Sequence, residues 1–127
     1  MDALNSDNVT KTSKKVNLMA KSTDIKLPTT IELEKSVQLF KAFGDQTRYK
    51  ILFLLTERSL SVNEIAEIIG ISQSAISHQL KLLRQTGLVR GIRSGQKVNY
   101  QLSDRHIMTI FEQVREHVSE KRTGAAN

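Results

Sequence analysis

The stretch SVNEIAEIIGISQSAISHQLKLLRQTG, residues 61–87, decides the fold. Its apolar residues recur at three- and four-residue steps on both sides of Gly70-Ile71-Ser72, which predicts two short helices joined by a three-residue turn. Ser61 and Glu64 have the capping-box spacing that starts a helix, and Ser72 is the expected N-cap of the second helix. Two helices joined this tightly indicate a helix-turn-helix, in which the first helix supports the second against the major groove of DNA.

After Gly87 the pattern changes from helical to strand-like. The segments LVRGIR and QKVNYQL flank Ser94-Gly95, which we expect to form a two-residue hairpin turn. A hairpin directly after a helix-turn-helix is a wing. Between His78 and Arg105 there are six cations and a single acid, Asp104; the cations are Lys81, Arg84, Arg90, Arg93, Lys97 and Arg105. Contact with DNA phosphates explains this excess, so Arg93 and Lys97 on the wing are expected DNA contacts. A solvated hairpin on an ordinary helical domain is the alternative, and the order of the elements argues against it.

The segments before the helix-turn-helix complete a single domain. IELEKSVQLFKAF is expected to form a helix that ends at Gly44, and Asp45 to cap a buried helix over QTRYKILFLLTE. We therefore predict a winged helix-turn-helix domain over residues 29–121, mainly α with a β-hairpin wing. Residues 1–28 are predicted to be a disordered basic arm, and residues 122–127 a flexible tail.

Composition narrows the class of function. The chain has 127 residues, a net charge of +6, 5% aromatic residues, no Trp and no Cys. This balance favours a polyanionic partner, double-stranded DNA, over a small-molecule substrate. No Gly-rich phosphate loop, nucleophilic Cys or one-turn metalloprotease His pair is present, so we do not expect an enzyme. Because no apolar run resembles a signal peptide or a membrane span, we expect a cytoplasmic protein without membrane contacts.

The stretch LSDRHIMTIFEQVREHVSEK, residues 102–121, reads as a closing helix with an apolar stripe. At about 100° per residue, one side of this helix carries five apolar residues. They are Ile107, Ile110, Phe111, Val114 and Val118. The stripe lies on the last helix of a domain that already has a core, so it needs a partner. Pairing with a second copy across a two-fold axis is the commonest solution, and we expect a homodimer through the terminal helices.

Two histidines border that stripe. His106 and His117 lie about 16 Å apart along the helix axis, whereas a zinc ion needs nitrogens within about 2.1 Å of itself. If two helices run antiparallel, Asp104 and His106 of one subunit can close on His117 and Glu120 of the other. Asp104 can face the same way as His106 only if it sits at the non-helical entry of the helix. The spacing therefore predicts two metal sites per dimer, each shared between subunits.

From about Val37 to Glu120 the chain resembles the ArsR/SmtB family of winged-helix metal-sensing repressors. The resemblance is carried by FKAFGDQTRYKILFLL, by SLSVNEIAEIIGISQSAISHQLKLLRQTGLV, by the hairpin and by the closing helix beginning SDRH. It is most specific over Ser72–Leu80, the recognition helix. The resemblance implies that Gln73, Ser74, Ser77 and His78 lie at base edges or phosphates and that Lys81 contacts the backbone, roles that suit short polar side chains.

The resemblance also implies a metal site. Asp104, His106, His117 and Glu120 match the ligand pattern on the last helix of the family's zinc-sensing branch. Two imidazoles and two carboxylates without a thiolate suit tetrahedral Zn²⁺, with Co²⁺ as a mimic, and Ni²⁺ stays open if further ligands join. We therefore expect a repressor that binds an operator inverted repeat as a homodimer and is released by zinc. A winged-helix repressor that answers a non-metal signal, or that has no inducer, is the alternative.

Overall fold

The computed structural model describes residues 23–124, with the side chains of residues 23–119, and the chain divides after Glu34 into two units. Helix α2 (Thr30–Phe43) begins in the first unit, where the Glu32 N–H donates to the Thr29 hydroxyl (3.2 Å). The second unit carries the rest of α2 and every later element. The predicted arm falls mostly on residues 1–22 and the predicted tail partly on residues 125–127, outside the described residues; both stay predictions.

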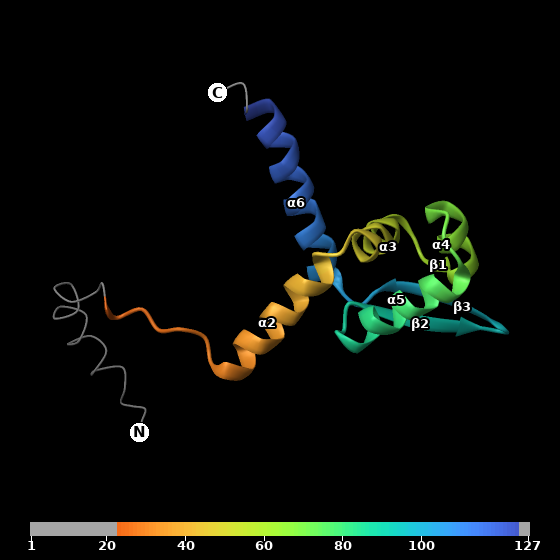
Figure 1. The fold of residues 1–127 in the computed structure, drawn as a ribbon, viewed down its shortest axis with the longest axis horizontal. Coiled ribbons are helices and arrows are strands. Elements are labelled where there is room, and N and C mark those ends of the chain that lie inside the picture. The colour runs from red at the N-terminus through yellow and green to blue at the C-terminus, as the bar shows by residue number, and fades with distance from the viewer. Residues whose placement is uncertain (1–22, 125–127) are drawn as a thin grey trace. The chain divides into compact units, whose positions relative to one another are not determined.

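Three helices form the predicted helical centre of the second unit: α3 (Gln46–Glu57), α4 (Val62–Ile69) and α5 (Gln73–Gln85). All three predicted N-caps are present. Asp45 accepts from the Arg48 N–H (2.9 Å), Ser72 accepts from the Ala75 N–H (3.1 Å), and Ser61 and Glu64 form a reciprocal capping box. Helix α4 ends at Gly70, whose φ of 86° is the left-handed conformation that favours glycine at a helix end. Helices α4 and α5 pack together as a helix-turn-helix (Figure 1).

The wing is part of a three-stranded antiparallel sheet with strand order β1-β3-β2. Strands β2 (Val89–Ser94) and β3 (Lys97–Leu102) form the predicted hairpin (Figure 1). Ser94 pairs with Lys97, so the turn is Gly95-Gln96, and our placement at Ser94-Gly95 was wrong by one residue. Gly95 has a φ of 66° and no other residue of the turn has a positive φ, as in a type II′ turn with glycine first. Strand β1 (Leu60–Ser61), which pairs with β3, was not predicted.

One hydrophobic core joins these elements. Most of its fully buried side chains come from α3, α4 and α5; they are Ile51, Leu52, Ile65, Ile76, Leu80 and Leu83. Leu60 of β1, Leu88 just before β2 and Phe111 of α6 complete the set. The central position predicted for α3 is confirmed, because three of its residues are buried. This core fixes α5 against α3 and the sheet, so the exposed side of α5 keeps a defined orientation.

Helix α6 (Arg105–Gly124) joins the core through its first half. Phe111 is 1% exposed, and its ring lies 4.8 Å from that of Tyr49 and 5.3 Å from that of Phe43, between ring centroids. Ile107 is buried as well. The five-residue stripe expected to face a partner is therefore divided: Ile107 and Phe111 pack within their own subunit, and Val114 and Val118 stay exposed at 37% and 49%. No helix within the described residues is long and apolar enough to cross a membrane.

Candidate DNA-binding surface and metal centre

Helix α5 has two chemically different sides. Ile76, Leu80 and Leu83 are buried on the side that faces the core. The opposite side is exposed and carries every residue predicted to contact DNA from this helix: Gln73, Ser74, Ser77, His78 and Lys81. Amides, hydroxyls and an imidazole can donate to or accept from base edges, and the Lys81 ammonium can approach a phosphate. The exposed side of α5 is therefore chemically suited to the major groove.

The first turn of α5 is held in place by its cap. The Ser72 hydroxyl accepts from the Ala75 N–H and also lies 3.3 Å from the Ser74 hydroxyl, with either group able to donate. This link keeps the Ser74 side chain close to the start of the helix. The N-terminal end of a recognition helix is the part that enters the groove, so the order of this turn matters for base contact.

The wing carries its two predicted DNA contacts on opposite faces. In an antiparallel ladder, directly opposed residues share a face and successive residues alternate between faces. Lys97 is paired with Ser94, and Arg93 with Val98, so Arg93 and Lys97 project to different sides of the hairpin. Both are exposed, and the Arg93 guanidinium lies 3.5 Å from the Gly95 carbonyl oxygen. The tip of the wing is thus positively charged on both faces.

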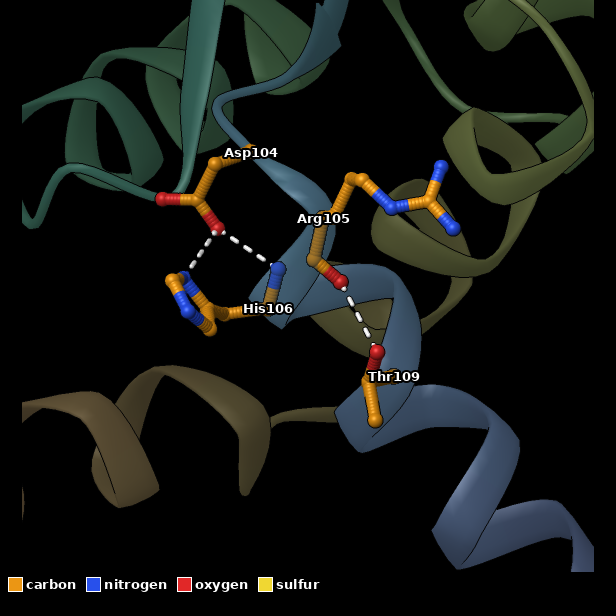
Figure 2. Close-up of polar contacts among 4 residues, drawn as sticks. All are labelled: Asp104, Arg105, His106 and Thr109. Atoms are coloured by element: carbon orange, nitrogen blue, oxygen red, sulfur yellow. Dashed lines mark hydrogen bonds and ion pairs between the residues drawn. The ribbon is translucent and has the colours of Figure 1, made fainter.

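Two of the four predicted metal ligands meet at the start of α6. Asp104 precedes the helix and caps it, because its Oδ1 accepts from the His106 backbone N–H (2.8 Å). The same oxygen lies 3.2 Å from Nδ1 of the His106 ring. Figure 2 draws both contacts of this oxygen. The prediction that Asp104 sits at the non-helical entry is confirmed. Among the described residues, Asp104 Oδ2 and His106 Nε2 have no hydrogen-bond partner, and the two side chains are 53% and 92% exposed. A carboxylate oxygen and an imidazole nitrogen that are free of other partners are ligand types that zinc accepts.

The other two predicted ligands lie further along α6. His117 is exposed, eleven positions after His106. At about 1.5 Å per residue, it cannot approach His106 within one straight helix. Glu120 belongs to α6, but its side chain is not among those described. Within residues 23–119 of one chain, no three His, Cys, Asp or Glu side chains gather closely enough to hold a metal ion. The chain thus brings Asp104 and His106 together and leaves His117 apart.

Sequence reasoning missed one polar link to the recognition helix. Arg48, in the first turn of α3, donates from Nη1 to the side-chain oxygen of Gln79 on α5 (3.1 Å). The two residues are 31 positions apart, and nothing in their neighbourhoods marks them as a pair. The one available signal is a cation in the first turn of a helix whose later residues are mostly apolar.

Comparison with known proteins supports the same family as the sequence motifs. The family description "Bacterial regulatory protein, arsR family" matches residues 45–90, which run from the cap of α3 to the start of the wing. The chain is 34% identical over 89 residues to the transcriptional repressor SmtB homolog of Synechocystis sp., covering 70% of this chain and 67% of that protein. It is 37% identical over 84 residues to the cadmium resistance transcriptional regulatory protein CadC homolog of Staphylococcus aureus, covering 65% and 69%.

A solved structure supports the fold. The homodimeric winged helix-turn-helix DNA-binding domain of Mb0332 from Mycobacterium bovis superimposes with a TM-score of 0.69, at 24% identity, covering 80% of this chain and 93% of that one. At that identity the likeness concerns the fold alone. The sequence relatives are transcriptional regulators, so the expectation that the chain is not an enzyme is confirmed. With the helix-turn-helix, the wing and these relatives together, the chain belongs to the arsR family of bacterial regulatory proteins, which bind DNA and regulate transcription.

Proposed function

We propose that this regulator is a metal-responsive repressor. It binds an operator inverted repeat as a homodimer, and it leaves the operator when the last helices of its two subunits bind zinc together. The main support for a metal response is the contact between Asp104 and His106, whose side chains are 3.2 Å apart at the start of α6. The other predicted histidine ligand, His117, lies far along the same helix. The names of the SmtB and CadC homologs, a repressor and a cadmium resistance regulator, support the same class of activity.

The DNA-binding step follows from the two surfaces described above. Gln73, Ser74, Ser77 and His78 on α5 read base edges in the major groove, and Lys81 neutralises a phosphate. Arg93 and Lys97 contact the sugar-phosphate backbone, each from a different face of the wing. Each phosphate contact releases counterions, so operator affinity falls steeply with salt while its sequence preference stays with the residues of α5.

The homodimer is supported by the exposed part of α6. Val114 and Val118 remain accessible although Ile107 and Phe111 of the same stripe are buried, so the second half of α6 carries apolar surface without a partner in its own subunit. Burial against the same helix of a second copy satisfies it and places two recognition helices about a two-fold axis. Mb0332, with the same fold, is a homodimer.

The metal site is completed between subunits. Asp104 and His106 of one subunit face His117 and Glu120 of the other, and the two-fold axis produces two such sites. Asp104 holds the His106 ring through Nδ1, which leaves Nε2 as the ligand nitrogen. Zinc, when bound, supplies coordinate bonds that tie the two helices together. Cobalt is the closest mimic; without cysteine, the chain offers cadmium none of the thiolates that this softer ion prefers.

Metal binding is expected to release DNA by changing how the two subunits are arranged. When His117 and Glu120 of one subunit are held against Asp104 and His106 of the other, α6 takes a fixed position across the two-fold axis. Because Phe111 anchors α6 in the core, this position is passed on to α3 and α5. The two recognition helices then no longer match successive major grooves. Coupling of about 1–3 kcal/mol between metal and DNA is the usual size of such an effect.

The test is operator affinity at fixed salt, with and without saturating zinc, for the wild type, His117→Ala and Glu112→Ala. Zinc is expected to weaken wild-type binding roughly ten- to a hundredfold, in keeping with ordinary allosteric coupling. His117→Ala should bind DNA normally and lose the response. Glu112, an exposed acid about 240° around the helix from His106, is the matched control and should retain the response. If zinc leaves the operator affinity of the wild type unchanged, the regulator responds to a signal other than zinc or has no inducer.

A further inference from the structure

We propose that Arg48 is the positioning residue that sets the recognition helix at a fixed distance from the end of α2, and that it acts through Gln79. By this contact it determines which spacing of operator half-sites the dimer accepts. The inference rests on the proposed operator-binding dimer and adds to it the residue that sets the specificity for half-site spacing. Neither Arg48 nor Gln79 belongs to the surfaces assigned to DNA or metal.

The Arg48 guanidinium joins two elements that are distant in sequence. Its Nε donates to the Ala42 carbonyl (3.2 Å) and its Nη2 to the Lys41 carbonyl (3.3 Å), both in the last turn of α2. Its Nη1 donates to the Gln79 side-chain oxygen (3.1 Å) on α5. The last carbonyls of a helix have no partner within the helix, so a cation placed there is doubly favoured, by hydrogen bonding and by the helix dipole. One side chain therefore terminates α2 and holds α5.

Arg48 itself is held firmly. Its backbone N–H donates to Oδ2 of the α3 cap Asp45 (2.9 Å), and α3 buries Ile51, Leu52 and Leu55 in the core. The residue is also partly buried, so its charge-assisted hydrogen bonds meet less competition from water than those of an exposed arginine. The backbone of Arg48 is therefore held in place, so its guanidinium can position both helices.

Direct packing does not hold α2 and α5 together at this place. A hollow of about 390 Å³ lies between them. Its lining includes Gln38 and Lys41 from α2, Leu82 and Gln85 from α5, the α5 C-cap Thr86, and Arg48. Arg48 lines this hollow and contacts Gln79 on α5. Because Gln79 directly follows His78 along α5, a movement of Gln79 also moves the residues assigned to base contact.

The experiment measures affinity for a set of operators whose half-sites are separated by the preferred spacing, or by one or two base pairs more or fewer. The wild type is compared with Arg48→Ala, Gln79→Ala, the double variant and Gln79→Glu. Each single alanine variant should bind the preferred operator about tenfold more weakly, the size of losing one hydrogen bond to a charged group, and should discriminate less between spacings. The double variant should be no worse than the weaker single variant, because both changes break one bridge.

Two controls separate positioning from general damage. Lys50→Ala removes an exposed cation from the same helix, and Gln85→Ala removes an amide that faces the hollow from α5; both should keep the wild-type spacing profile. Gln79→Glu keeps an oxygen for Arg48, so its spacing preference should survive even if its overall affinity changes. Thermal unfolding of Gln79→Ala, which leaves both contacts to α2 intact, should show no more than the loss of one hydrogen bond, with the domain fully folded at the temperature of the binding assay.

The outcomes are distinct. Single variants that lose affinity equally at every spacing, or a double variant whose loss is the sum of both, would overturn the positioning role while the operator-binding dimer stands. A wild-type protein that accepts every spacing equally would overturn the proposed dimeric repressor, and this inference with it.

Discussion

At the scale of single residues, Asp104 has two functions that can be separated. Its Oδ1 caps α6 by accepting from the His106 backbone N–H, and the same carboxylate orients the His106 ring. An asparagine in this place retains a side-chain oxygen for the cap and removes the negative charge. An alanine removes both.

We therefore expect Asp104→Asn to fold with nearly wild-type stability in the absence of metal and to bind zinc more weakly. Asp104→Ala should also bind zinc weakly, and it should lose about 1 kcal/mol of unfolding free energy, the usual effect of removing an N-cap. Denaturant unfolding of the metal-free protein and a zinc titration measure the two effects. If Asp104→Asn binds zinc as the wild type does, Asp104 caps the helix and is not a ligand.

At the scale of the element, the capping box of α4 makes the stability of this helix depend on pH. The pKa of Glu64 lies below its ordinary 4.5, chiefly because its carboxylate accepts the Ser61 backbone N–H, while desolvation opposes the shift. The Ser61 hydroxyl, Lys97 and Arg58 lower the pKa further. A lowered folded-state pKa means that the ionised carboxylate stabilises the fold at pH values above 4.5 and that this contribution is lost as the pH falls through the folded-state value.

Glu64→Gln tests that dependence, because glutamine also fits the capping box but carries no charge. The variant should be less stable than the wild type at neutral pH. The difference should shrink as the pH falls from 4.5 through the lower folded-state pKa of Glu64, since the wild-type carboxylate becomes protonated over this range. Denaturation midpoints at neutral and acidic pH provide the comparison. A difference that is the same at both pH values would mean that the charge of Glu64 adds nothing to the cap.

The elements with strong local signals could be predicted from the sequence, and those set by long-range pairing could not. Asp45, Ser61 and Ser72 are polar caps just before apolar runs, so the starts of α3, α4 and α5 were predicted correctly. Strand β1 has two residues and exists because it pairs with β3, about 40 positions later, which no local pattern reports. Both Ser94-Gly95 and Gly95-Gln96 include the glycine of the turn, and the cross-strand register alone distinguishes them.

The candidate site also combines features set by local sequence with features set by long-range packing. Which side of α5 is buried and which is exposed follows from helix periodicity, and the position of Asp104 follows from capping preferences. Both were therefore predictable from the sequence. The division of the α6 stripe was not, because Phe111 is buried by Phe43 and Tyr49, which are far away in sequence. The Arg48–Gln79 contact has the same origin: it depends on how α3 packs against α5.

At the scale of the whole molecule, the remaining apolar surface of α6 leads to a prediction about assembly. Val114→Glu should leave each subunit folded, because Val114 is already 37% exposed, and should dissociate the dimer. Operator affinity should then fall by about a hundredfold or more, since two linked half-site contacts become separate binding events. Gln113→Glu, which adds the same charge at the neighbouring exposed position, is the control. Sedimentation velocity and operator titration measure both results; a dimeric Val114→Glu would place the interface elsewhere.

The short strand β1 has a consequence for how this regulator moves. Ser61 belongs to two elements at once, since it pairs with Asn99 of β3 and caps α4. The pairing of β1 with β3 thereby joins the wing to the helix-turn-helix through backbone contacts. We therefore expect the proposed DNA contacts of α5 and of the wing to form and break together. A state in which the wing alone holds the duplex while α5 has left the groove is not expected.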